Sequence, residues 1–376
     1  MCHLIYTDTF YMKRKWIRWV SWILLTPIIL FVILMVLLYV PPVQNLLRRE
    51  VTAYASKATG MQIQVERIDL RFPLNLLVRG VEVIQQPDTL LSLESLNVRV
   101  QAWPLIKGKV EVDEVTLSRV AVNSADLMEG MKIKGVLGRF FLQSHGVDLS
   151  NELAVINQVE LSDTHVQLLM NDTTTTPKDT TASAPINWKV ALHQLKLKNV
   201  SFSMQLPADS MRMAAHIGEA AIDDAQADLK NQYYDLKKFL LSGTSASYDT
   251  GTAEPAEGFD ASHIAVRDIR IALDSLLYKG RDMNAVIREF TMNERSGLSV
   301  TSLTGRAYSN DSVICVPGLK LNTPHSEIDL SAHTYWELVN IPTTGRLSAR
   351  LNAYIGKEDV MLFAGGLPES FKEAYP

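Results

Sequence analysis

The chain has 376 residues, 47% hydrophobic and 21% charged, with a formal net charge of −4 at pH 7. This balance argues against a nucleic-acid-binding protein and is that of an ordinary folded chain rather than a disordered one. Of the two cysteines, Cys2 falls in the first eleven residues, which we interpret below as a leader, and the one remaining thiol, Cys315, cannot build a disulfide framework; the length fits either two compact domains or one long single-layer array.

Residues 1–18 form a short segment that ends in a basic cluster, at residues 13–18. Such a cluster before an apolar run holds the N-terminus in the cytoplasm. Residues 1–11 differ in composition from the rest of the chain, so we expect the true start at Met12. Cys2 falls in this leader, and we interpret Cys315, which has apolar neighbours, as a packed core cysteine.

Residues 19–40 contain no charged side chain. At about 1.5 Å per residue, a helix of this length reaches roughly 33 Å, which is enough to cross a hydrocarbon core. We predict a single-pass signal anchor with an extracytoplasmic bulk, and with Trp19, Trp22 and Tyr39 at the two interfaces. A cleaved signal peptide is the alternative, but its apolar region is usually shorter, and two prolines stand where small residues would mark cleavage.

The segment 43–59 predicts one short amphipathic helix, because apolar residues recur at helical spacing and Gly60 comes next as a stop. From residue 61 the period changes to two, which indicates half-buried strands separated by turn signals through region 61–170. The pattern apolar-x-x-apolar-polar-apolar recurs at residues 112–117, 156–161, 192–197 and 266–271. Its irregular spacing suits a meandering sheet with variable loops, and chance recurrence is the alternative.

Two low-complexity segments interrupt this alternation, a Thr-rich one at residues 171–185 and a second at residues 243–258, and we predict both as loops. Region 186–376 otherwise continues the strand pattern. Residues 214–240 are rich in Ala and charge and could be partly helical, but strands are favoured there.

The predicted fold is therefore mainly β: a transmembrane helix and a short amphipathic helix, then an elongated, curled, antiparallel-type sheet that forms a groove. A sheet with one apolar face hides it by closing, by packing helices on it, or by filling it with acyl chains, and helices are scarce here. The alternative is a sandwich or barrel that serves as a scaffold or partner-binding module. The candidate groove-lining residues are Ile68, Leu70, Val81, Val83, Val98, Val100, Val110, Val112, Val115 and Leu117.

Motifs that carry chemistry are missing from the sequence. The eight histidines are scattered without metal-ligand spacing, and neither phosphate-loop pattern nor a nucleophile elbow is present. We therefore expect no metal, no cofactor and no enzyme; an anchored envelope hydrolase would need a clustered acid, base or nucleophile.

A short pattern, Asp followed by Ser or Thr and then by an apolar residue or Thr, resembles an O-glycosylation signal of some Gram-negative envelopes. Chance matches are the alternative for so short a pattern. Its candidate acceptors are Thr89, Thr173, Thr180, Ser210, Ser275 and Ser312.

The order of these segments resembles a known family. An anchor, a helix ending at Gly60, and the strand patterns at residues 61–68, 76–83, 90–122 and 318–328 are similar to those of AsmA-like and TamB-like envelope proteins. The resemblance implies an inner-membrane anchor, a periplasmic curled sheet with an open apolar interior, and phospholipid acyl chains as cargo. It also implies a link to outer-membrane biogenesis, with assistance to assembly through an outer-membrane β-barrel partner as an alternative role. Family members are much longer and end in a characteristic domain that is absent here, so we expect this chain to correspond to their N-terminal portion.

Overall fold

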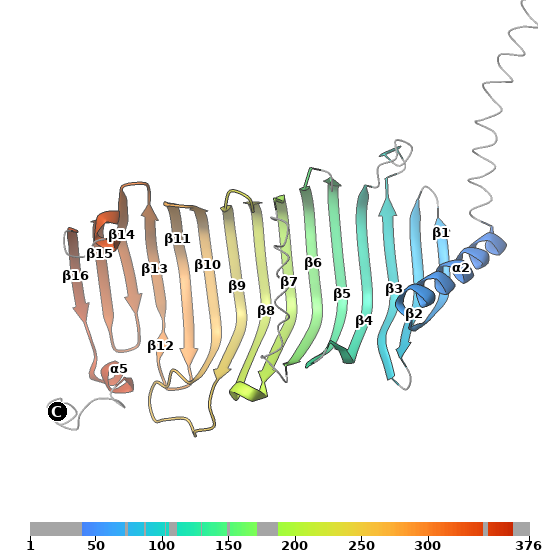
Figure 1. Cartoon of the computed structure of the whole chain (residues 1–376). Helices are drawn as coiled ribbons and strands as arrows, with labels where there is room; N and C mark the ends of the chain where they lie inside the picture. Colours follow the sequence, from blue (N-terminus) through green and yellow to red (C-terminus); the bar gives the residue numbers. More distant parts are fainter. Residues whose placement is uncertain are drawn as a thin grey trace, which may run out of the picture.

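The computed structural model describes residues 40–71, 74–85, 88–101, 103–104, 111–128, 130–148, 151–170, 187–340 and 345–363. These residues form one large, open, curled sheet of 16 strands, with one helix beside its first strand (Figure 1). No helix in these ranges is long and apolar enough to cross a membrane. The predicted anchor at residues 19–40 lies outside them, apart from Val40.

The helices are α2 (Pro41–Thr59), the 3-10 helix η1 (Pro207–Asp209), α4 (Trp336–Asn340) and α5 (Lys357–Leu362). The strands of the first half are β1 (Gln62–Arg71), β2 (Asn75–Gln85), β3 (Asp88–Val100), β4 (Val112–Met128), β5 (Met131–Asp148), β6 (Leu153–Met170), β7 (Lys189–Leu206) and β8 (Met211–Asp228). Those of the second half are β9 (Tyr233–Asp249), β10 (His263–Lys279), β11 (Asp282–Glu294), β12 (Ser299–Val300), β13 (Ser302–Ser309), β14 (Val313–Asn322), β15 (Glu327–Tyr335) and β16 (Leu347–Tyr354).

The strands lie side by side in chain order, except that the short β12 pairs only with β11. The described strands of the sequence-predicted regions 61–170 and 186–376 thus belong to one sheet. The prediction of antiparallel pairing needs one correction, because β6 and β7 are parallel, with Leu153 opposite Lys189 and Leu169 opposite Gln205. A parallel pair needs a connection of a dozen or more residues, and the Thr-rich segment between these two strands, itself outside the described residues, is long enough.

Helix α2 confirms the predicted amphipathic helix and begins slightly earlier, with a proline in its first turn. It ends where expected, because Gly60 takes a left-handed conformation at φ 70° and donates its N–H to Ser56 O. The side chains of Gln44 and Arg48 donate to backbone carbonyls of β1, and Ser56 accepts from the N–H of Ile63. The helix thereby covers the outer edge of the first strand.

Strands β8 and β9 confirm the strand prediction for residues 214–240. The prediction of a loop at residues 243–258 is wrong in its first part, because β9 continues to Asp249. Small residues from Gly243 to Ser247 look like low complexity in the sequence, yet they belong to a strand between β8 and β10, which is irregular at Gly243, where φ is 58°. The loop prediction for residues 171–185 falls outside the described residues.

A crease crosses strands β1 to β9. On each of these strands two consecutive residues, such as Ser118 and Arg119, separate two residues of the opposite face, such as Leu117 and Val120. The backbone there has positive φ on several strands, for example 59° at Gly80, 46° at Arg119 and 51° at Asp163. Neighbouring strands must approach closely, since a Cβ added at Gly138 would lie 2.7 Å from Asp163 Cβ. Such irregularities bend and twist strands, so an aligned row of them curls the whole sheet.

An apolar trough as candidate functional site

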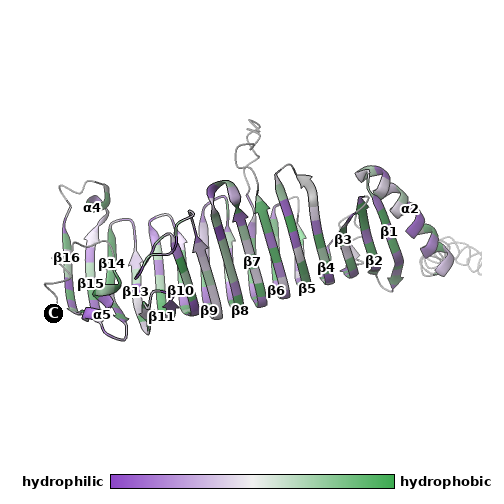
Figure 2. Cartoon of the chain, turned by 90° about the horizontal axis from the view of Figure 1, so that it is seen from below, coloured by the Kyte–Doolittle hydropathy of each residue, from purple (hydrophilic) through white to green (hydrophobic). Residues whose placement is uncertain are grey.

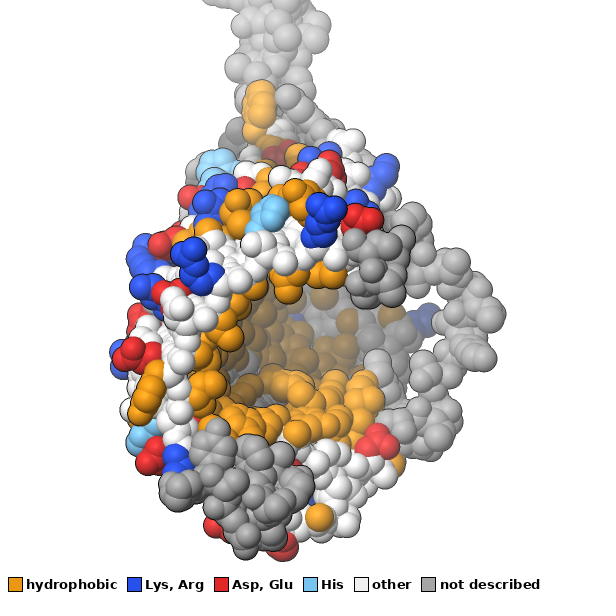
Figure 3. Space-filling model, turned by 90° about the vertical axis from the view of Figure 1, so that its left-hand side faces the viewer, with side chains coloured by type: hydrophobic (Ala, Val, Ile, Leu, Met, Phe, Trp, Pro, Cys, Tyr) orange, Lys and Arg blue, Asp and Glu red, His pale blue; other side chains and the backbone are white. Residues whose placement is uncertain are grey.

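The concave side of the curled sheet is an apolar trough, which we define as the face that carries Ile68 and Leu117. Hydrophobic side chains gather along its interior, whereas Lys, Arg, Asp and Glu gather on the outside (Figure 3). Along the strands, hydrophobic and hydrophilic residues alternate (Figure 2). One pleated layer therefore presents an apolar face inward and a polar face outward.

Two apolar rows, one on each side of the crease, run from strand to strand through directly opposite residues, and neither contains an ionisable side chain. The first row is Ile68, Val78, Leu96, Leu117, Phe140, Leu161, Leu197, Ala220, Leu241 and Ile271. The second row is Val65, Val81, Leu93, Val120, Leu137, Thr164, Val200 and Ile217.

The structure places the predicted groove residues on this face, except Val110, which lies outside the described residues. Ile68 and Leu70 lie opposite Val78 and Leu76, and Val81 and Val83 lie opposite Leu93 and Leu91. Across β3 and β4, the opposite pairs are Val98 with Val115, Val100 with Val112, and Leu96 with Leu117.

The recurring sequence pattern has a structural explanation. In its first copy, Val112 and Val115 lie opposite Val100 and Val98, which are two residues apart on one face. The strand therefore carries an extra residue, and both apolar positions of the pattern reach the trough. The second and third copies lie on the same rung, because Val159 and Leu195 are partners. The fourth copy, in β10, also ends in the first apolar row, because Ile271 lies opposite Leu241, but its middle apolar residue, Ile269, lies opposite Thr244 on the other side of the crease.

The trough is open rather than packed. No large side chain is fully buried among the described residues, and only a few apolar residues are nearly buried, such as Ile68 at 7% exposure. On the trough face, Phe202 is 41% and Met213 38% exposed. The apolar surface that a sandwich or barrel would cover thus remains accessible.

The convex face carries ion pairs and polar contacts instead. Arg99 lies 3.1 Å from Glu114, and Arg119 contacts Glu94. Lys237 donates to Asp235 at 2.6 Å, and this bond raises the pKa of the lysine above its ordinary value. These groups lie on a solvated surface, where such pairs contribute little to stability.

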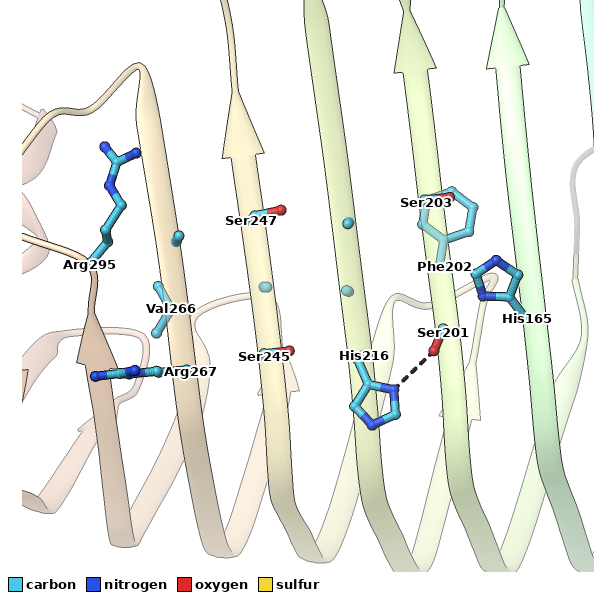
Figure 4. A pocket seen from close by; sticks show the side chains of 14 residues that line it. His165, Ser201, Phe202, Ser203, His216, Ser245, Ser247, Val266, Arg267 and Arg295 are labelled. Carbon is cyan, nitrogen blue, oxygen red and sulfur yellow. Dashed lines mark hydrogen bonds between the residues drawn. The ribbon is translucent and has the colours of Figure 1, made fainter. Parts of the chain in front are cut away.

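A shallow cavity of about 540 Å³ lies on strands β6 to β11 (Figure 4). Its floor consists of small residues such as Ser201, Ser245 and Ser247, and His165, His216 and Arg267 stand around it. Ser201 Oγ lies 2.9 Å from His216 Nδ1. Within the described part of the chain, this is the one hydrogen bond of the His216 ring, so the pair lacks the orienting carboxylate of a nucleophilic triad. Sequence reasoning missed this cavity, because its residues come from separate strands.

The remaining candidate residues are scattered. Thr89 is exposed at the start of β3, Ser210 comes after η1 in the turn before β8, and Ser312 is exposed in the turn before β14. Ser275 lies within β10 and accepts a hydrogen bond from Asn284 at 3.0 Å. The other candidates, Thr173, Thr180, Trp19, Trp22 and Tyr39, fall outside the described residues.

No group of three or more His, Cys, Asp or Glu side chains that could hold a metal ion occurs among the described residues. No protein-family model matches the chain, and no curated protein gives a significant match.

Proposed function

We propose that this protein is an inner-membrane-anchored, periplasmic protein of the AsmA-like and TamB-like kind, whose trough carries phospholipid acyl chains between the inner and outer membranes. The observation that carries the proposal is the open trough: uncharged rows run from strand to strand, and their side chains are mostly half-exposed. In this role the protein contributes to outer-membrane biogenesis without catalysing a reaction.

The physical basis is the transfer of hydrocarbon out of water. Each buried CH₂ group contributes roughly 0.8 kcal/mol, so an acyl chain lying along the rows is held without any specific polar contact. Because the rows contain only apolar side chains and Thr, the same contacts repeat from one strand to the next. An acyl chain can therefore shift along the trough, because each new position offers the same apolar contacts as the previous one.

The experiment is photo-crosslinking in cells, with the crosslinking residue placed on adjacent positions of opposite faces. Val83 and Leu117 face the trough, and their neighbours Glu82 and Thr116 face outward and serve as matched controls. We expect phospholipid adducts, identified by mass spectrometry, at the two trough positions and not at the controls. Protein adducts alone at all four positions would contradict lipid carriage.

A second candidate function is a scaffold that binds another protein during outer-membrane protein assembly, without lipid. The observation that favours it is the last strand, β16, in which Leu347 and Leu351 are 60% and 61% exposed. Exposed edge strands with apolar side chains pair readily with strands of other chains. In the same crosslinking experiment, a probe at Leu351 that captures one defined outer-membrane protein, together with lipid-free trough positions, would support this candidate over lipid carriage.

A further inference from the structure

Helix α2 has two dissimilar sides. On the side toward the sheet, Gln44 Nε2 donates to Leu70 O at 3.1 Å, Arg48 Nη1 to Glu66 O at 2.8 Å, and Ser56 Oγ accepts from Ile63 N at 3.1 Å. On the opposite side, Leu46 is 59% and Tyr54 78% exposed. Eight positions are about 2.2 turns, so these two side chains point roughly 80° apart and form one broad stripe on this half of the helix.

The geometry fixes the direction in which that stripe faces. The three hydrogen bonds reach backbone groups on the outer edge of β1, the first strand of the series, and α2 runs obliquely across this end of the sheet in Figure 1. The side of α2 opposite to the bonds therefore faces away from the sheet, along the axis on which the strands succeed one another. The helix also begins directly after Val40, the last residue of the uncharged run 19–40.

We propose that the outer side of α2 lies flat on an anionic phospholipid surface and stands the trough upright on the membrane. This inference rests on the proposed membrane anchor. Leu46 and Tyr54 enter the boundary between headgroups and acyl chains, where aromatic and apolar side chains of interfacial helices reside. Glu50 lies between them. Arg48 donates to β1, so Arg49 and Lys57 are the basic residues of α2 left outside the sheet contact; both are exposed, and with Glu50 they leave one net positive charge, which suits anionic lipid.

Two other orientations of the protein on the membrane would place different residues at the lipid surface. A helix perpendicular to the membrane would place Tyr54 about 21 Å from Val40 along its axis. A trough lying on its side would instead bring strand ends to the membrane, including the connection after β3 with Trp103, which is 70% exposed. In the upright orientation, β16 stands far away, since strands about 4.8 Å apart place it roughly 65 Å from β1.

The test uses the full chain reconstituted into phosphatidylethanolamine–phosphatidylglycerol vesicles that contain nitroxide-labelled lipid. In a Cys2→Ser, Cys315→Ala background, an environment-sensitive fluorophore is attached to Tyr54→Cys, Trp103→Cys or Tyr354→Cys. Tyr354 is 71% exposed on the last strand and is the matched control for Tyr54. We expect the label at position 54 to lose about half of its emission or more, because interfacial helices sit roughly 5–10 Å into the boundary. The label at position 354 should remain unquenched.

Vesicle flotation of the same samples distinguishes this inference from the function on which it rests. A floating protein with an unquenched label at position 54, or with stronger quenching at position 103, would overturn the upright placement and leave the anchor and the lipid trough standing. A protein that does not float would overturn the anchor and this inference with it. Lipid adducts at Val83 test the trough independently of both.

Discussion

The first and last strands of the sheet, β1 and β16, differ in what covers their outer edges. At the first edge, α2 runs along β1 and supplies side-chain partners to its backbone at four positions. At the last edge, every residue of β16 is exposed, and α5 touches only the turn and loop at one end of the neighbouring strands. Both strands have the same alternating pattern, so the difference lies in what accompanies them.

Unpaired strand edges recruit other strands unless they are covered, charged or bent away. A covered first edge ends the strand series beside α2, whereas an open last edge with a continuous apolar face can be extended by a further strand. In the described part of the chain, the trough is therefore closed to strand addition at one end and available for it at the other. Substitutions at each edge test this contrast.

The largest effect is expected from removing the cover of the first edge. In Gln44→Ala/Arg48→Ala, the carbonyls of Val65, Glu66 and Leu70 lose their side-chain donors. We expect the local free energy of unfolding to fall by about 1–3 kcal/mol, because hydrogen bonds from charged donors are among the stronger ones. Hydrogen exchange of residues 62–71 should accelerate accordingly, while Arg49→Ala, on the exposed side of α2, should leave it unchanged. Equal exchange in both variants would mean that α2 does not protect β1.

A smaller effect is expected where α5 is fixed near the last edge. Asp359 is buried and accepts hydrogen bonds from the hydroxyls of Thr323 and Ser326, and Ser326 Oγ accepts from Gly356 N at 3.0 Å. Asp359→Ala leaves these hydroxyls without their acceptor and should lower the free energy of unfolding by about 1–2 kcal/mol. The measurement is the unfolding midpoint together with exchange of residues 357–363. Glu358→Ala, at an exposed neighbour, is the control and should change neither.

The alternating strands and the helix before Gly60 could be predicted from the sequence, because side-chain periodicity reports directly on burial and on φ preference. The crease could not: Arg119 and Asp163 adopt positive φ without being glycine, so nothing local marks them. At residues 243–249 a local signal is present but misleading. Small residues there suggest a loop, and only their pairing with β8 shows that they form a strand. The bond between Thr323 and Asp359 also joins residues that are distant in sequence, and the pairing of β16 with β15, which places Tyr354 opposite Glu327, brings α5 to the turn between β14 and β15.

At the last edge itself, a charge should alter association more than stability. Leu351→Lys places an ammonium group on a side chain that is already 61% exposed, so its stability cost should stay within roughly 0.5 kcal/mol. Sedimentation in detergent should nevertheless show weaker concentration-dependent association, because lysine on an edge strand discourages pairing. Val339→Lys, at a 57% exposed position in α4, is the control and should associate like the unmodified protein. Unchanged association in Leu351→Lys would remove β16 as a pairing edge.

The smallest effect is a pH dependence of the loop between β9 and β10, which contacts α5. Asp260 accepts from Ala256 N at 3.0 Å, from the His263 ring at 2.9 Å and from Ser262 N at 2.9 Å, and these bonds lower its pKa to about 2 from an ordinary 3.8. Folding therefore favours the carboxylate, and its contribution is complete above about pH 4 and is lost as the pH falls toward 2. The same loop contacts α5, since Phe259 N donates to Leu362 O at 2.7 Å.

Hydrogen exchange near this loop should consequently accelerate between pH 4 and pH 2, after correction for the intrinsic rate. Asp260→Asn should abolish that step, whereas Glu257→Gln, an exposed neighbour, should keep it. The cover of the first edge uses Gln, Arg and Ser side chains, none of which titrates in this range, so residues 62–71 should show no corresponding step. Acid thus loosens the surroundings of the open edge before those of the covered one; a step of equal size at both edges would show that the whole sheet, rather than its last edge, responds to protonation.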